Sequence, residues 1–150
     1  MPTTADAISY LTFSLGAEAF AVRAERIEVI LGSVPVTKVP RGPAHVRGVF
    51  NQRGRIVPLV DLGAVLGVSS GAGDRRCTIV VRAGPAGREP GLLGLEVDDV
   101  REVVGVRSSE VQPSPRTRGV EGLVEIRGAL TLLLDVDRVL DAGEIGDLSS

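Results

Sequence analysis

The sequence repeats itself with a period of 74 residues, and this repeat constrains the fold more than any other feature. Shifted by 74 positions, residues 46–67 align with residues 120–141, and eight of the 22 aligned positions are identical without a gap. The same shift places Glu28-Val29-Ile30 over Glu102-Val103-Val104. Because a repeated sequence encodes a repeated supersecondary unit, the chain is predicted to contain two copies of one small architecture.

Each aligned block has the pattern of a strand, a tight turn, a second strand and a short helix. Arg53-Gly54 and Arg127-Gly128 interrupt the apolar runs, and glycine supplies the positive φ that hairpin turns need. Asp61 and Asp135 are the predicted N-caps of the helices. The apolar residues that follow at helical spacing, and the glycines expected to end the helices, are Leu62, Val65, Leu66 and Gly67 in the first copy and Val136, Val139, Leu140 and Gly143 in the second.

The rest of the sequence favours β-structure. Residues 55–60 are predicted to form a strand, with Pro58 at an edge, at a bulge or among its last residues, because proline cannot donate to a ladder. The small and flexible composition of residues 67–76 suits a connection between the two copies. The other predicted strands are at residues 11–15, 19–22, 27–31, 36–39, 78–82, 92–97 and 100–106.

About ten short strands in two sets of five indicate a mainly β fold of two small barrels. The first β-barrel half is expected at about residues 8–67 and the second at about residues 77–141, with a C-terminal tail at 142–150. A half of roughly 70 residues buries too little surface to be very stable alone. Residues 1–150 are therefore predicted to form a single domain.

The composition lacks the residues that most catalytic, metal and base-stacking chemistries use. There is one histidine (His45), one cysteine (Cys77), one lysine (Lys38) and no tryptophan. Gly67–Gly71 matches G-x-S-x-G around Ser69, but it follows a helix pattern and no histidine lies downstream. Cys77 lies inside an apolar strand and is expected to be an inert core residue. We therefore predict no enzyme, no catalytic residue and no cofactor.

A metal site is not expected either. Asp135, Asp137 and Asp141 lack the glycine and the closing glutamate of a calcium loop. One cysteine allows no intramolecular disulfide, the N-terminus has no secretory pattern, and the longest apolar run is far below the roughly 20 residues that span a bilayer. The sequence thus predicts a cytoplasmic protein without membrane insertion, whose function depends on surfaces.

One charged window stands out from the background. Residues 38–55 contain five basic residues and no acidic residue. Such a face could meet an acidic protein or nucleic acid, and the alternative is an arginine-rich solvated rim. The members of this basic face are Lys38, Arg41, Arg47 and Arg55, with Arg53 in the turn between the predicted strands.

A series of motifs, in order from about Tyr10 to Leu140, resembles the CheW-type chemotaxis coupling family. The segments that carry the resemblance are residues 13–20, 27–31, 39–43, 48–62, 78–81, 94–100, 111–115, 122–123 and 132–135. The resemblance implies two intertwined five-stranded SH3-like β-barrels with short helices and a hydrophobic seam between them.

The resemblance also implies a non-catalytic adaptor in a chemosensory array. Its implied partners are the regulatory domain of a CheA-type histidine kinase, the cytoplasmic tips of chemoreceptors and further CheW-like domains. The implied receptor-binding residues are Ile27, Val29, Ile30, Gly48, Arg53, Gly54, Val100 and Val103.

Two questions stay open at the level of the sequence. Gly48 and Gly54 recur as Gly122 and Gly128, so both are equally explained as backbone requirements of a hairpin. Gln52 stands where the family usually has leucine, which leaves the identity of the partner open. The alternative function is a CheW-like module repurposed for another motility or regulatory complex, associated with nucleic acid through the basic face.

Overall fold

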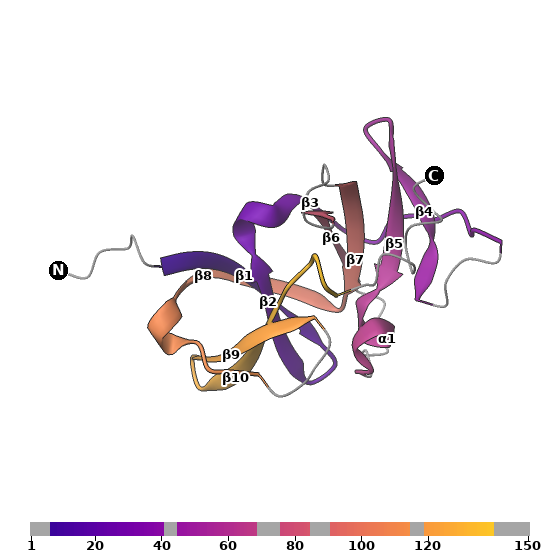
Figure 1. The fold of residues 1–150 in the computed structure, drawn as a ribbon. Coiled ribbons are helices and arrows are strands. Elements are labelled where there is room, and N and C mark those ends of the chain that lie inside the picture. The colour runs from indigo at the N-terminus through magenta and orange to yellow at the C-terminus, as the bar shows by residue number, and fades with distance from the viewer. Residues whose placement is uncertain (1–6, 41–44, 69–75, 85–90, 115–118, 140–150) are drawn as a thin grey trace.

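The computed structural model describes residues 7–40, 45–68, 76–84, 91–114 and 119–139. These residues form ten strands, one α-helix and two short 3-10 helices (Figure 1). The elements are β1 (Ala7–Leu15), β2 (Glu18–Arg23), η2 (Ala24–Arg26), β3 (Ile27–Leu31), β4 (Val46–Gln52), β5 (Arg55–Asp61), α1 (Leu62–Leu66), β6 (Cys77–Ala83), β7 (Gly91–Val97), β8 (Asp99–Arg107), η3 (Ser108–Glu110), β9 (Val120–Ile126) and β10 (Ala129–Leu134).

The strands form two five-stranded mixed sheets that exchange strands between the sequence halves. Sheet A has the order β8-β1-β2-β10-β9, and sheet B has the order β3-β6-β7-β5-β4. Each order becomes the other when every strand number is shifted by five, so the two sheets are equivalent. The hairpin β1–β2 lies in the sheet of β8, β9 and β10, and the hairpin β6–β7 lies in the sheet of β3, β4 and β5. The intertwined architecture is thereby confirmed, and the boundary between the sequence halves is not a boundary between the sheets.

Each sheet is closed by the segment that follows one of its edge strands. After β3, the backbones of Thr37 and Val49 exchange two hydrogen bonds of 2.8 Å, which join this segment to β4. After β8, Gln112 and Leu123 form the corresponding pair, which joins that segment to β9. We refer to the two closed units as barrel A and barrel B.

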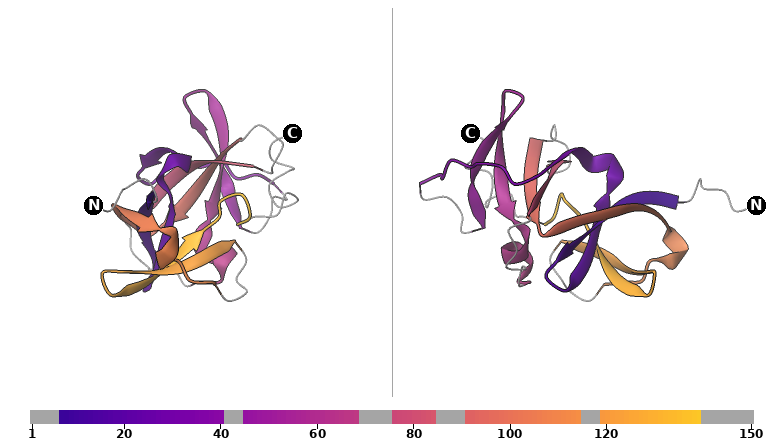
Figure 2. Two further views of the ribbon diagram at one scale, coloured as in Figure 1. Left: turned by 60° about the vertical axis from the view of Figure 1, so that its left-hand side comes forward. Right: turned by 180° about the vertical axis from the view of Figure 1, so that it is seen from behind.

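The largest core lies between the barrels and draws on both sheets. Phe13 and Phe20 of sheet A are stacked with ring centroids 5.9 Å apart. They belong to one buried cluster with Ile79 and Leu95 of sheet B. Smaller cores lie within barrel A, around Tyr10 and Leu133, and within barrel B, around Phe50 and Val57. Figure 2 shows the two sheets joined along this seam.

The repeated hairpin turns are confirmed. Arg53 and Gly54 have φ values of 50° and 84°, and Arg127 and Gly128 have values of 51° and 81°. Two successive residues of positive φ make the turn type whose twist matches the flanking strands. The first predicted helix is confirmed as α1, which Asp61 caps by accepting from the Ala64 amide and Gly67 ends with a φ of 71°.

Three sequence predictions about local structure are wrong. Residues 36–39 contribute one bridge at Thr37 and no strand. The residues after Asp135 form a turn rather than the predicted helix, although the Asp135 carboxylate accepts from the Asp137 amide and its carbonyl accepts from the Arg138 and Val139 amides. Leu140, Gly143, the connection at 69–75 and the tail 142–150 lie outside the described residues.

The third wrong prediction concerns Pro58, expected at an edge, at a bulge or near the end of its strand. It lies inside β5, which is an interior strand between β7 and β4. Pro58 is the fourth of its seven residues and lies opposite Val49. The amide and carbonyl of Val49 are bonded to Thr37 on the other side, so this pair needs no amide from β5. The ladder to β7 begins only at Leu59. The missing N–H therefore falls where neither neighbour requires it.

We expect neither sequence half to fold alone, because each half contains a hairpin whose partner strands belong to the other half. Separate chains of residues 1–75 and 76–150 should show no cooperative unfolding by circular dichroism. An equimolar mixture should recover a sheet spectrum and one cooperative transition. Independent folding of either half would contradict the exchange of strands.

Candidate functional site

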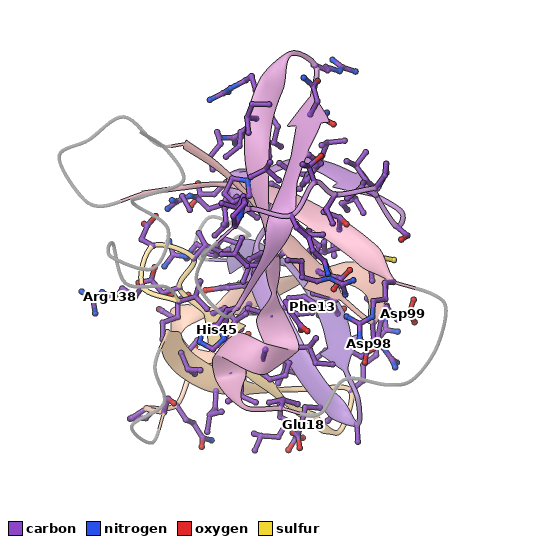
Figure 3. All side chains as sticks on the ribbon, turned by 90° about the vertical axis from the view of Figure 1, so that its right-hand side faces the viewer. Phe13, Glu18, His45, Asp98, Asp99 and Arg138 are labelled. Carbon is purple, nitrogen blue, oxygen red and sulfur yellow. The ribbon has the colours of Figure 1, made fainter. Side chains whose placement is uncertain are left out.

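The hairpin formed by β4 and β5 projects from barrel B and presents the predicted turn motif at its tip (Figures 1 and 3). Arg53 and Gly54 are exposed, and Ile56 is 63% exposed although it is a large aliphatic residue. The Asn51 side chain accepts a 2.9 Å hydrogen bond from the Gly54 amide, which fixes the turn. The tip therefore combines a rigid backbone with a guanidinium and an exposed apolar side chain.

The hairpin formed by β9 and β10 carries the same elements at the matching positions. Leu130, which aligns with Ile56, is 60% exposed. The arginines differ, however, because Arg127 lies 3.0 Å from Glu102 in an ion pair. Glu28, which aligns with Glu102, is paired instead with Arg82 at 2.7 Å. Within the described part of the chain, Arg53 therefore has no acidic partner.

The predicted residues of β3 lie at the edge of sheet B. Ile27 packs against the core between the barrels, and Val29 packs against the core of barrel B. Ile30 is exposed. Ile27 and Val29 are thus largely structural, and Ile30 is the apolar side chain of this strand that remains open to a partner.

The backbone around position 48 requires glycine whether or not a partner binds there. Its φ is 152°, and a Cβ atom there would lie 2.4 Å from the Thr37 carbonyl oxygen. A Cβ at Gly122 would lie 2.5 Å from a Val111 side-chain carbon. Both glycines let the closing segment approach its edge strand. Gly54 is different, because a Cβ there would meet no atom within 4 Å.

The remaining predicted residues belong to the other sheet. Val100 and Val103 lie on β8, an edge strand of sheet A; Val100 packs on the core between the barrels and Val103 is exposed. The structure therefore brings Val29 and the β4–β5 hairpin together around the core of barrel B. It places Val100 and Val103 on the other barrel.

The comparisons with known proteins agree with this architecture. A family model described as the CheW-like domain matches residues 9–144. The chain belongs to the CheW-like family. It is 31% identical to the chemotaxis protein CheW of Rhizobium meliloti (strain 1021), over 89% of this chain and 88% of that protein. It is also 31% identical to the chemotaxis protein CheW of Thermotoga maritima, over 94% and 95% of the two chains.

The fold has a close match among solved structures. The crystal structure of the scaffolding protein TtCheW from Thermoanaerobacter tengcongensis superimposes with a TM-score of 0.81 at 23% sequence identity, over 96% of this chain and 92% of that one. The predicted fold class and family are thus confirmed. The protein is a chemotaxis scaffold of the CheW family, a non-catalytic class.

The candidate reactive residues are dispersed in this CheW-like protein. Cys77 is partly buried against the core between the barrels. His45 uses its backbone carbonyl to accept from the Asp61 amide, and Ser69 lies outside the described residues. In the described ranges, no three His, Cys, Asp or Glu side chains gather as metal ligands, and no helix is long and apolar enough to span a bilayer.

One arginine of the basic face is paired with a carboxylate of the protein itself. Arg47 and Arg76 both pair with Oε1 of Glu96, at 2.9 and 2.7 Å, and the Glu96 side chain is almost fully buried. A buried carboxylate needs such partners, so Arg47 has a structural role. Lys38 and Arg55 are exposed, and Arg41 lies outside the described residues.

Sequence reasoning missed a polar cluster in barrel A. The Tyr10 hydroxyl donates a 2.8 Å hydrogen bond to Glu121, whose carboxylate lies 3.5 Å from Arg23. Burial, and then the hydrogen bond to Glu121, raise the pKa of Tyr10 to about 12. The three residues are 13 to 111 positions apart, so the sequence carries no local signal for this cluster.

The raised pKa of Tyr10 predicts a loss of stability in alkali. The phenol holds its proton more tightly in the folded chain, so its contribution is complete below pH 10 and is lost between about pH 10 and 12. We expect unfolding titrations to show a loss of about 1–2 kcal/mol across this range, absent in Tyr10→Phe. Because Tyr10 is the single tyrosine, phenolate absorbance reports it directly, and a midpoint near pH 10 would contradict the prediction.

The glycines give a second prediction. Gly48→Ala should lower the free energy of unfolding by more than about 2 kcal/mol, because its Cβ would collide with backbone. Gly54→Ala should cost only about 1 kcal/mol, from the strain of positive φ alone. Urea titrations of both variants measure the difference. Equal losses would show that the close approach at Gly48 is unimportant.

Proposed function

We propose that this protein is a cytoplasmic adaptor that couples chemoreceptors to a CheA-type histidine kinase in a chemosensory array. Family membership and the class of its relatives support this role. One partner is the regulatory domain of the kinase, and the other is the cytoplasmic tip of the receptor. Further CheW-like domains are additional partners in such an array.

The receptor site in this proposal has two parts. The first comprises Gly48, Arg53 and Gly54 of the β4–β5 hairpin with β3, where Ile30 presents an exposed apolar side chain. The second is the exposed Val103 of β8, with Val100 behind it. Ile27 and Val29 support the first part from the cores beneath, and Gly48 sets the backbone of its strand.

The observation that carries the proposal is the difference between the two arginine tips. Both arginines are exposed, but Arg127 is ion-paired with Glu102, whereas Arg53 has no acidic partner among the described residues and lies on a rigid turn beside an exposed isoleucine. Arginine next to apolar surface is typical of residues that dominate protein interfaces. Its charge requires an acidic side chain on the partner, because a buried guanidinium must be paired.

Charge reversal at the two tips tests the proposal with an internal control. We expect Arg53→Glu to weaken binding of a receptor tip at least tenfold in a titration or co-sedimentation assay, because the variant repels the acid that Arg53 would pair with. Arg127→Glu makes the same change at the repeated position and should alter affinity less than threefold.

Arg53→Glu should unfold at the same temperature as the parent chain, and Arg127→Glu at an equal or slightly lower temperature, because it loses the exposed ion pair with Glu102. Equal effects at the two tips would argue against Arg53 as the interface residue. A parent chain that binds neither a receptor tip nor a kinase regulatory domain at micromolar concentration would exclude the adaptor role. Steeply salt-dependent DNA binding, lost on reversal of Arg41, Arg47 and Arg55 in a variant that still unfolds cooperatively, would favour the nucleic-acid alternative instead.

A further inference from the structure

A cavity of about 530 Å³ opens at one end of barrel A. Its volume lies within the range of about 300–1,000 Å³ that is usual for ligand pockets. It lies where β2 begins, next to Glu18, which Figure 3 labels at the lower end of the molecule. The residues that line it come from β1, β2, β8 and the β9–β10 hairpin: Thr12, Ser14, Gly16, Ala17, Glu18, Ala19, Arg101, Glu102, Ile126, Arg127, Ala129 and Thr131.

The strand register identifies the equivalent positions in barrel B. Leu133 lies opposite Ala21, which lies opposite Thr12. These three residues form one row across neighbouring strands of sheet A. The equivalent row of sheet B is Leu59, Gly94 and Val80, because Leu59 and Leu133 are related by the 74-residue repeat. The two barrels can therefore be compared residue by residue.

The next row of residues explains why barrel A, and not barrel B, has a cavity at this end. In barrel A this row is Thr131, Ala19 and Ser14. The corresponding residues of barrel B are Val57, Leu92 and Arg82, of which Val57 is fully buried and Leu92 packs on the same core. Barrel B thus carries larger side chains at the positions where barrel A has three small residues in the equivalent register of its own sheet.

The cavity also contains an unpartnered polar group. Ser14 is 7% exposed and lines the cavity, and its hydroxyl has no hydrogen-bond partner in the ranges that the structure describes. The hydroxyls of Thr12 and Thr131 are bonded to the backbone carbonyls of Glu102 and Ala129. The Ser14 hydroxyl is therefore available to hydrogen-bond to a group that enters the cavity.

The aromatic residues of the chain indicate what that group is. Phe13, Phe20, Phe50 and Tyr10 are all buried in the protein's own cores, and the chain has no other aromatic side chain. Tyrosine and tryptophan are frequent anchors of protein interfaces. Since this chain buries its own phenylalanines and tyrosine, an aromatic anchor at one of its interfaces would come from the partner. The cavity has apolar walls at Ala19, Ala129 and Ile126. It is also lined by the charged side chains of Glu18 and Arg101 and by the Glu102–Arg127 ion pair.

We propose that the cavity of barrel A receives a tyrosine side chain of a partner protein. The ring would lie against the alanine and isoleucine walls, near the guanidinium group of Arg101, where cation–π attraction favours an aromatic face. The phenol hydroxyl would hydrogen-bond to Ser14. The proposal rests on the adaptor function, because it assigns one contact of that assembly, on the barrel that does not carry Arg53.

The cavity itself is tested with 4-methylphenol, the tyrosine side chain as a free molecule, and with toluene, which lacks the hydroxyl. In NMR titrations of the full chain, we expect 4-methylphenol to shift the amide signals of Ser14, Ala19 and Thr131 and to bind at least fivefold more tightly than toluene. Ser14→Ala should remove that preference. An absence of shifts at these residues, or a preference that Ser14→Ala leaves unchanged, would overturn the proposal.

Filling the cavity tests its role in binding. Ala19→Leu with Thr131→Val introduces residues that barrel B carries at the equivalent positions. We expect this variant to lose 4-methylphenol binding and at least tenfold of its affinity for one partner, while its melting temperature stays equal or rises. Ala19→Ser is the matched control, which keeps the cavity and both affinities. Ala19→Leu alone serves if the double variant does not fold.

The outcomes separate this inference from the proposed function. Unchanged affinity of the filled variant for both the receptor tip and the kinase regulatory domain would overturn the tyrosine pocket and leave the adaptor function intact. Binding of 4-methylphenol by a chain that binds neither partner would support the chemistry of the cavity and overturn the adaptor function. Full loss of partner binding in Arg53→Glu, with 4-methylphenol binding retained, would support both.

Discussion

The insertion of each N-terminal hairpin into the opposite half is the constraint on which the rest of the structure depends. β1–β2 fills the gap between β8 and β10, and β6–β7 fills the gap between β3 and β5. The chain therefore crosses between sheets twice, through η2 and at Asp98. At the second crossing, the Asp98 carboxylate accepts from the Gly16 amide at 2.6 Å and so holds the β1–β2 turn against the crossover. The seam between the barrels follows from this topology, because both inserted hairpins bury one face in it.

Much of the local structure could be predicted from the sequence, because it depends on signals within a few residues. The Arg-Gly turns, the cap at Asp61 and most strand positions are of this kind. The exchange of hairpins has no such signal: alternation of apolar residues indicates which face of a strand is buried, but not which strand it pairs with. Pro58 illustrates the same limit. Its acceptable place in an interior strand depends on the Thr37–Val49 bridge, which joins residues outside that strand.

The candidate site, like the fold, could be predicted from the sequence only in its local features. The repeat and the family resemblance selected the hairpin tip, and the structure places it in solvent. The resemblance implied Arg53, but the repeat alone could not separate Arg53 from Arg127, since the two residues occupy equivalent positions of the two copies. They also could not show that Arg47 shares the carboxylate of Glu96 with Arg76, because the three residues meet only after β4 and β7 enter the same sheet. Burial and pairing are tertiary properties, and they decide which arginine is free.

One pair of equivalent strand positions is linked to both asymmetries between the barrels. By strand register, Arg82 of barrel B and Ser14 of barrel A are equivalent, since they lie opposite Leu92 and Ala19. Arg82 reaches Glu28 and occupies it, so Arg53 on the same barrel has no acidic partner among the described residues. Serine is too short to make the matching pair, so Glu102 takes Arg127, and the space an arginine would cover stays open as the cavity. The divergence between these equivalent positions thus leaves Arg53 of one barrel without an acidic partner among the described residues and leaves a cavity in the other barrel.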